Sequence, residues 1–600
     1  MTERIETSGP TLELVLGPRE RAAYDVAARR AVEEHWVERL AERDPSLWSS
    51  DPAVQAAIAD RLGWLDAPTH FAEQTGSLET FGEEARAGGF TAAVVAGMGG
   101  SSLAPLVLRE TFGITPDWLD VRVLDSTDPA AVAAVVDDLD PLTTLFIVAS
   151  KSGTTVEPLA FLADAHARIE AALRERRHPR SVDAADFLAI VSDPGKSVAA
   201  IPHHDRVPSV FLNPPDIGGR YSALTYVGLL PGSLLGLDLD ELLGSAQVML
   251  SAATTRENPA VNGALALGLA IGTLAKGGRD KLTFVADPEI ATLGAWLEQL
   301  IAESTGKHGV GIVPVDLEPL GSPDRYGDDR VFVRLALRGS SGPAATDEVG
   351  DADELLAELA TLGHPVIRIA LTDPMDLGGE FVRWEVATAI AGAVLGIDPF
   401  DQPNVEEAKQ LTRAVLAAKE AGVAPAPAVP LIRGEGLALF PDAALRGAEG
   451  TVSLVGALAA HLARRGPKSY LALQAFIAPS PAVDAAALRI RRLLRDATGS
   501  ATTFGYGPRF LHSTGQLHKG GAPIGWFLQL TADHPVDRPI PDAPFTFGEL
   551  VDAQAAGDFA AIEGHDLPIV RIHLGADPAT GMAALERALA AALGTTQARG

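Results

Sequence analysis

The chain of 600 residues contains no cysteine, which excludes disulfides, thiolate nucleophiles and cysteine-ligated metal sites. It also lacks a long apolar run. The most apolar window, residues 261–275, is shorter than the roughly 18 apolar residues that a membrane-spanning helix requires, so it predicts a buried helix. The opening stretch MTERIETSGP is polar and has no apolar segment typical of a secretion signal. We therefore expect a cytoplasmic protein.

Positive charge is also scarce. The chain has 49 Lys and Arg residues against 78 Asp and Glu residues, a formal net charge of −29. Long-range repulsion disfavours nucleic acids and anionic membranes as partners. An anionic small molecule would have to be held by local backbone N–H groups and a few cationic side chains. Hydrophobic residues at 47% describe an ordinary globular composition, and the length predicts two to four domains.

Helical and strand patterns follow one another along the chain. Apolar spacings of three and four predict an N-terminal helical region over residues 1–85. Short apolar runs that end in glycine or polar turns come next, which is typical of parallel strands buried on both faces. The first series comprises residues 91–97, 121–126, 144–150 and 187–193. The second series comprises residues 281–287, 309–316, 330–337 and 364–371.

A third series of strands follows the Pro/Ala-rich stretch 421–430, which we interpret as a linker. It comprises residues 469–476, 501–507, 525–531 and 567–574. HPVIRIALTDP in the second series matches LPIVRIHLGADP in the third, and each precedes an alanine-rich helix that ends in Leu-Gly. LIAESTGK likewise matches LLRDATGS. These ordered matches predict duplication of a whole α/β domain. The alternative is that alanine-rich α/β segments simply look alike.

Two strands of the first series lead into loops suited to an anion. GMGGSSLAP (97–105) and ASKSGTT (149–155) combine glycines with hydroxyls and run into predicted helices. Glycine lets the backbone approach a ligand, and free N–H groups at a helix start attract negative charge. A structural turn is the alternative for either loop alone. Neither loop has the GKS or GKT ending of a nucleoside triphosphate loop. Two such loops favour a phosphate pocket at the carboxyl ends of the sheet.

Five stretches together resemble the glucose-6-phosphate isomerase family, which is built from phosphosugar isomerase (SIS) domains. The other three are GGRYSALTYVGLLP (218–231), WLEQLIAESTGK (296–307) and GIDPFDQPNVEEAK (396–409). The resemblance covers about residues 90 to 410 and is strongest to the isomerase half of bifunctional transaldolase/phosphoglucose isomerase proteins. It implies a proton transfer between neighbouring sugar carbons through an enediolate, with no metal and no organic cofactor.

The resemblance also implies the roles of individual residues. Glu303 matches the carboxylate base, Arg220 the cation that steadies the enediolate, and Lys409 a group for ring opening. Ordinary alternatives are a helix-end carboxylate, a structural ion pair and a solvated lysine, respectively. Substrate contacts fall on Gly100, Ser101, Ser150, Lys151, Ser152, Thr154, Thr155, Gln299 and Gln402.

One expected group is missing from this set. The family carries a histidine after the glutamate, often in a context such as LHSxGQ, whereas this chain has GSPDRYGDDRVF there. The corresponding place in the third series holds FLHSTGQLHKGG, with His512 at the family position and Asp496 where the glutamate would stand. In the family this histidine comes from the other subunit of a dimer. We predict that the C-terminal copy lends His512 within one chain; the alternative is a loop histidine in a degenerate domain. His518 and Lys519 are further candidates for substrate contacts.

We therefore expect an α/β protein of three-layer α/β/α sandwich SIS-type domains with parallel sheets. Their expected bounds are 86–235 for the first domain, 236–420 for the second and 430–600 for a diverged C-terminal repeat. The expected activity is glucose-6-phosphate isomerisation in glycolysis and gluconeogenesis, by a monomer with an internal pseudo-dimer or by a homodimer. Alternatives are a related isomerase that also accepts mannose 6-phosphate, and a non-catalytic SIS sugar-phosphate-binding protein.

Overall fold

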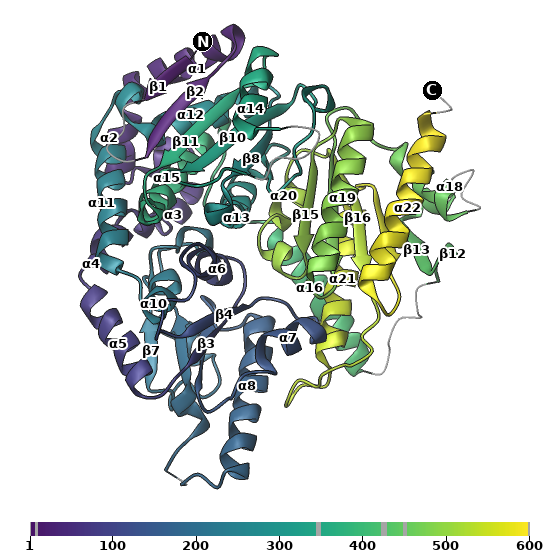
Figure 1. Ribbon diagram of the computed structural model, residues 1–600. Helices are drawn as coiled ribbons and strands as arrows, with labels where there is room; N and C mark the ends of the chain where they lie inside the picture. The colour runs from purple at the N-terminus through teal and green to yellow at the C-terminus, as the bar shows by residue number, and fades with distance from the viewer. Residues whose placement is uncertain are drawn as a thin grey trace.

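The computed structural model describes residues 2–5, 10–179, 181–343, 350–421, 429–447 and 453–597. These residues form three sheets, each covered by helices, and the predicted α/β class is confirmed. Figure 1 shows the first two sheets in purple, blue and teal, with the green and yellow third sheet beside them. All twelve predicted strands are present. Most of the predicted linker, 422–428, lies outside the described residues.

The first sheet has the order β4-β3-β5-β6-β7, and all its strands are parallel. Its strands are β3 (Ala92–Gly97), β4 (Asp120–Leu124), β5 (Thr144–Ala149), β6 (Leu188–Ser192) and β7 (Ser209–Leu212). The central strands β3, β5 and β6 are buried on both faces, as the unbroken apolar runs predict. Ala93 and Val95 of β3 pack with α6 (Gly100–Phe112) and α10 (Tyr226–Leu235). Val94 and Ala96 pack with α7 (Pro129–Val136) and α8 (Val156–Glu175) on the other face. The short edge strand β7 was not predicted.

The second sheet has the order β1-β2-β11-β10-β8-β9. Its parallel strands are β8 (Lys281–Ala286), β9 (Val313–Val315), β10 (Arg330–Leu337) and β11 (Val366–Leu371). The hairpin β1 (Thr2–Ile5) and β2 (Thr11–Val15) adds to it antiparallel to β11. The expectation that residues 1–85 are helical is therefore wrong for these first strands. Their alternating apolar residues, such as Leu12 and Leu14, bury one face of the hairpin.

The third sheet repeats this arrangement strand for strand, in the order β12-β13-β17-β16-β14-β15. Its parallel strands are β14 (Tyr470–Phe476), β15 (Thr502–Tyr506), β16 (Gly525–Thr531) and β17 (Ile569–His573). A hairpin of β12 (Ile432–Gly434) and β13 (Leu437–Pro441) pairs antiparallel with β17. The same order and the same strand directions in both sheets support duplication of one domain.

The remaining helices cover these sheets. In the N-terminal segment they are α1 (Pro18–Glu33), α2 (Trp36–Ala41), α3 (Pro52–Ala59), α4 (Ala67–Ala72) and α5 (Thr75–Ala87). Around the second sheet they are α11 (Leu239–Thr255), α12 (Gly263–Lys276), α13 (Leu293–Thr305), α14 (Ala352–Thr361) and α15 (Leu377–Leu395). After residue 400 they are α16 (Val405–Glu420), α17 (Ala443–Arg446), α18 (Leu454–Leu462), α19 (Pro481–Thr498), α20 (Gly515–Gly520), α21 (Phe547–Gly564) and α22 (Pro578–Gln597). A short helix, α9 (Lys196–Ala199), precedes β7.

An apolar cluster joins the second and third domains. Tyr470, Ala472 and Phe527 of the third sheet pack with Ala302 of α13 and Leu517 of α20. The approach is close, since a Cβ added to Gly306 would lie 2.4 Å from the Cα of Leu517. Figure 1 shows α13 beside α20 at this junction. The end of α13 is thereby fixed against the segment that carries His512.

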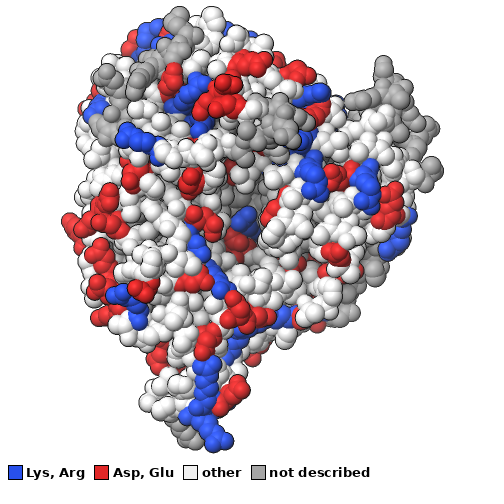
Figure 2. All heavy atoms as spheres, viewed as in Figure 1, with Lys and Arg blue, Asp and Glu red and all other residues white. Residues whose placement is uncertain are grey.

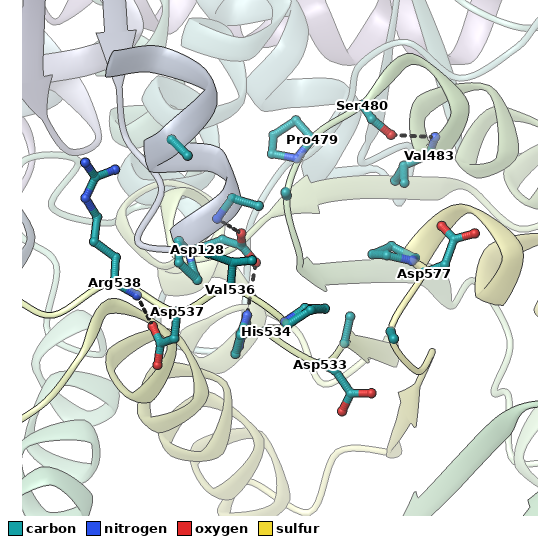
Figure 3. A pocket seen from close by; sticks show the side chains of 18 of the residues that line it. Asp128, Pro479, Ser480, Val483, Asp533, His534, Val536, Asp537, Arg538 and Asp577 are labelled. Carbon is teal, nitrogen blue, oxygen red and sulfur yellow. Dashed lines mark hydrogen bonds and ion pairs between the residues drawn. The ribbon is translucent and has the colours of Figure 1, made fainter. Parts of the chain in front are cut away.

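The loop after β4 joins the first domain to the third. Asp125 lies 3.7 Å from Arg509, and Asp128 lies 3.6 Å from His534. Beside this contact is a cavity of about 730 Å³, between α7 and the loops that follow β14, β16 and β17. Figure 3 shows Asp128 and His534 facing each other on its wall. None of the site residues predicted from the sequence lines this cavity.

The surface carries both signs of charge. On the face shown in Figure 2, blue basic and red acidic side chains alternate, and the described residues there form no broad basic surface. Among the described helices, none combines the length and apolar character needed to cross a bilayer.

We predict that Gly268→Ala lowers the thermal unfolding midpoint. Helix α12 packs on α15 through glycines, and a Cβ at Gly268 would lie 2.5 Å from the carbonyl oxygen of Ala387. Overpacking of this kind costs about 1–3 kcal/mol. The matched control is Gly244→Ala on α11, where an added Cβ meets nothing within 4 Å and is expected to be neutral or stabilising by up to about 1 kcal/mol. Equal midpoints for the two variants would contradict the packing argument.

We also predict a pH-dependent contribution of His534 to stability. Burial lowers the pKa of His534, but Asp552 and Asp128 outweigh that effect and leave the pKa above its ordinary value. The stabilisation is therefore complete below pH ~6.5 and is lost as the pH rises through the raised pKa. Thermal unfolding of wild type and His534→Gln measures it. The two midpoints should differ more at pH 6 than at pH 8.5, and a constant difference would argue against this ion pair.

Candidate active site

A cavity of about 340 Å³ brings together residues from all three domains. The first domain contributes Ser152, Thr154 and Thr155 from the loop between β5 and α8. Lys409 on α16 and His512, in the short helical turn Arg509–His512, complete the set of predicted residues on its wall. From Ser152 to His512 these groups span 360 positions of the sequence, yet they line one space.

The hydroxyl loop is suited to a phosphate group. Ser152 Oγ lies 3.1 Å from Thr154 Oγ1 and 3.4 Å from Thr155 Oγ1. The following helix, α8, begins without a side-chain cap, so its first N–H groups and the hydroxyls point to one anion site. Gly153 has a φ of 67° and passes so close to Ser197 that an added Cβ would lie 1.9 Å from its carbonyl oxygen. Ser150 is buried and accepts a hydrogen bond of 3.2 Å from Gly153 N–H.

The glycine loop after β3 brings three segments together. Gly99 has a φ of 55°, and a Cβ there would lie 2.7 Å from the carbonyl oxygen of His512. At Gly100 an added Cβ would lie 1.9 Å from the carbonyl oxygen of Gly219. Only glycine permits these approaches. Ser101 lies in the first turn of α6, which also begins without a side-chain cap.

The side chain of Gln299 connects Glu303 with the backbone of His512. Gln299, one turn earlier on α13, donates from Nε2 to Glu303 Oε2 at 3.1 Å and to the carbonyl oxygen of His512 at 2.8 Å. Glu303 is 8% exposed. It does not line the cavity itself, nor do Gln299 and Arg220.

Arg220 is a buried cation beside Glu303. Its Nη1 lies 3.5 Å from Glu303 Oε1. The guanidinium is fixed by Ser304 Oγ at 2.7 Å, by Gln402 Oε1 at 2.9 Å and by the carbonyl oxygens of Pro399 and Asp401. These four acceptors leave it little freedom to move. Gln402 thus contacts Arg220, and it does not line the cavity.

Lys307, four residues after Glu303, is a second buried cation. It donates to the carboxylate and the carbonyl oxygen of Asp401, both at 2.6 Å. Burial and the nearby Arg220 lower the pKa of Lys307 to about 8, against the opposing effect of Asp401. The sequence ESTGK therefore places a carboxylate and a lysine on either side of one helix end.

His512 is paired with a carboxylate that the sequence analysis missed. Its Nε2 lies 3.0 Å from Glu157 Oε1, and Glu157 is 4% exposed. Burial alone would raise the pKa of Glu157, but the His512 imidazole and the Lys409 ammonium outweigh it, so this pKa lies below its ordinary value. An ionised carboxylate only accepts hydrogen bonds, so Nε2 is the ring nitrogen that donates to Glu157. Glu157 directly follows GTTV, but no spacing in the sequence pairs it with His512.

Helix α16, which carries Lys409, is anchored by a side chain that follows His512. Gln516 is fully buried and accepts from the N–H of Asn404 at 2.8 Å. Its Nε2 donates to the carbonyl oxygen of Gly306 and to Asn404 Oδ1, both at 2.9 Å. The end of α13 and the start of α16 are therefore fixed to α20.

Three of the candidates lie elsewhere. Lys151 pairs with Asp193 at 2.6 Å and donates to the carbonyl oxygen of Pro215. His518 is buried 3.1 Å from Gln474 Nε2, and Lys519 forms a buried ion pair with Asp558 at 3.1 Å. None of these three lines the cavity. The described residues contain no group of three or more His, Asp or Glu side chains placed to hold a metal ion.

Comparisons with known proteins identify the family. The family model described as phosphoglucose isomerase matches residues 24–318. The glucose-6-phosphate isomerase of Rubrobacter xylanophilus is 31% identical over 406 residues, which cover 60% of this chain and 90% of that protein. The glucose-6-phosphate isomerase of Thermosynechococcus vestitus is 29% identical over 421 residues, covering 65% and 75%, respectively.

Two solved structures resemble this chain in fold. A hypothetical protein from Thermus thermophilus is 26% identical with a TM-score of 0.54, and the match covers 67% of this chain and 100% of that chain. A glucose-6-phosphate isomerase from Chlamydia trachomatis shares the fold, with 20% identity, a TM-score of 0.53 and coverage of 70% and 90%. From the relative matched along 90% of its length and from the family model, we conclude that this chain belongs to the phosphoglucose isomerase family.

Proposed function

We propose that this chain interconverts D-glucose 6-phosphate and D-fructose 6-phosphate in one site built from all three of its domains. The observation that carries the proposal is the shared Gln299, which hydrogen-bonds both Glu303 and the backbone of His512. It connects the residue proposed for proton transfer with the backbone of the residue proposed for ring opening. The family to which the chain belongs supports the reaction itself.

The phosphate group binds first in this mechanism. The hydroxyls of Ser152, Thr154 and Thr155 and the uncapped start of α8 receive it, with Ser101 and Ser150 on the neighbouring turns. Local N–H and O–H donors thereby hold an anion on a protein whose net charge is −29.

Ring opening then requires a proton to leave the anomeric hydroxyl and another to reach the ring oxygen. Lys409 and His512 face the same cavity and carry out this exchange. Because Glu157 accepts from Nε2 of His512, Nδ1 is the ring nitrogen that remains for proton exchange with the sugar.

The isomerisation step moves a proton between C1 and C2. Glu303 takes it from one carbon and returns it to the other, and Arg220 stabilises the negative charge that develops on the enediolate oxygen. Gln299 holds Glu303 Oε2 and so orients the carboxylate. Every proton is handled by a side chain of this chain.

We also propose the setting in which the enzyme works. A charged hexose phosphate does not diffuse across a membrane, so substrate and enzyme meet in the cytoplasm, in glycolysis and gluconeogenesis. Because Glu303 and His512 come from one polypeptide, a monomer is sufficient for activity.

Replacing Glu303 by Gln tests the proton-transfer role. We expect kcat for isomerisation to fall by roughly 10²- to 10⁴-fold, the usual contribution of a general base, while fructose 6-phosphate still binds. A coupled assay and calorimetric titration measure the two quantities. The surface variant Glu289→Gln is the matched control and should keep full activity. Retained turnover in Glu303→Gln would remove this residue from the mechanism.

Replacing His512 by Ala tests the ring-opening role. We expect His512→Ala to anomerise glucose 6-phosphate more slowly than wild type, because anomerisation needs ring opening and not the C2 proton transfer. NMR exchange measures the rate. Glu303→Gln should keep anomerisation, and the exposed His178→Ala serves as the control. Mixing His512→Ala with Glu303→Gln chains should restore no isomerisation, because each site uses one chain. Recovered activity in the mixture would show that the histidine comes from a second chain.

A further inference from the structure

The pair Glu157 and His512 has a third buried partner, Gln554 on α21. Its Nε2 donates to Glu157 Oε1 at 2.7 Å, the same oxygen that His512 contacts. Its Oε1 accepts from the hydroxyl of Thr127 at 2.6 Å. Gln554 and Thr127 are 2% and 0% exposed. A hydroxyl, an amide, a carboxylate and an imidazole therefore form one continuous chain between the first and third domains.

The chemistry of these groups fixes the direction of every hydrogen bond. An ionised carboxylate only accepts, so the amide must present its NH₂ group to Glu157 and its oxygen to Thr127. Thr127 must then donate. Two N–H groups, one from Gln554 and one from His512, thus converge on a single carboxylate oxygen. Hydrogen bonds to the charged form favour that form, and they hold Glu157 aimed at the imidazole.

The helix that carries Gln554 also supports the opposite wall of the cavity. His565, which directly follows α21, lies 2.9 Å from Glu407 on α16, and Glu549 on α21 pairs with Lys419. Lys409 lies on α16 between these two contacts. A single element of the third domain is therefore connected to both ring-opening groups.

We propose that Gln554 is a positioning residue for ring opening, which fixes the carboxylate of Glu157 against His512, with Thr127 orienting its amide. The inference rests on the proposed function and deepens it. It gives the third domain a second role, because that domain then supplies both the imidazole and a group that orders the partner of that imidazole.

The test uses the full-length protein with Gln554→Leu and Thr127→Val. Removing one hydrogen bond to a charged group should slow anomerisation of glucose 6-phosphate by roughly 10- to 100-fold in Gln554→Leu, with KM within about 3-fold of wild type. Thr127→Val should give a smaller loss of the same kind, and Thr127→Ser should restore the wild-type rate.

The pH profile separates positioning from a merely structural role. With one donor lost, Glu157 binds a proton more easily, so the acidic limb of the anomerisation rate should move to higher pH. The charged and titratable groups facing Glu157 are His512 and Lys409, and Glu406 and Arg413 line the same cavity. All four are unchanged in these variants.

Gln529→Leu is the matched control. Gln529 is fully buried and donates from Nε2 to the carbonyl oxygen of Ala555 on α21, but it does not touch Glu157. The variant Gln529→Leu should leave the acidic limb of the anomerisation pH profile unchanged. An unshifted limb and an undiminished rate in folded Gln554→Leu would overturn the proposal. If Gln554→Leu does not fold, Thr127→Val provides the test. An unshifted acidic limb and a wild-type anomerisation rate in Thr127→Val would then overturn the proposal. Absence of isomerisation in wild type would instead refute the proposed function.

Discussion

The contact between Glu157 and His512 is the constraint on which the proposed site depends. It spans 3.0 Å between residues 355 positions apart, in the first and third domains. A buried carboxylate is costly unless hydrogen-bonded donors compensate it, and here the donors come from the third domain. Docking of that domain thus stabilises the charge and delivers the imidazole in the same step. The apolar cluster of Ala302, Leu517 and Phe527 fixes the third domain on the second, next to the segment that carries His512, because packed interiors do not deform continuously.

The duplicated architecture gives a reason for the unequal copies. The second domain keeps the glutamate at the end of α13 and has GSPDRYGDD where a histidine would be expected. The third domain has His512 at that place and Asp496 in place of the glutamate, with Asp496 bonded to Arg495. One shared site requires one base and one imidazole, so each copy is free to lose the group that the other provides. Independent sites in the two copies would have required both groups twice.

The sequence predicted the fold well because local signals were strong. Continuous apolar runs such as residues 144–149 specify strands buried on both faces, and all twelve predicted strands were found. The hairpins β1–β2 and β12–β13 were missed because such short strands resemble loops. The loops of the site were found from glycine and hydroxyl patterns. Glu157 and Gln554 were not, because a buried glutamate beside a histidine is defined by a long-range contact that no spacing encodes.

A single polypeptide also changes the physics of a site shared between two copies of a domain. When a second chain lends the histidine, the fraction of complete sites falls as the protein is diluted. Within one chain, the lending domain is present at an effective concentration in the millimolar range or above, and buried contacts such as Gln516 with Asn404 and Gly306 fix its orientation. The cost is that two copies of the domain in one chain form a single site, whereas a dimer of two chains has two sites. In the proposed arrangement the chain gains a site whose assembly is part of its own folding, independent of protein concentration.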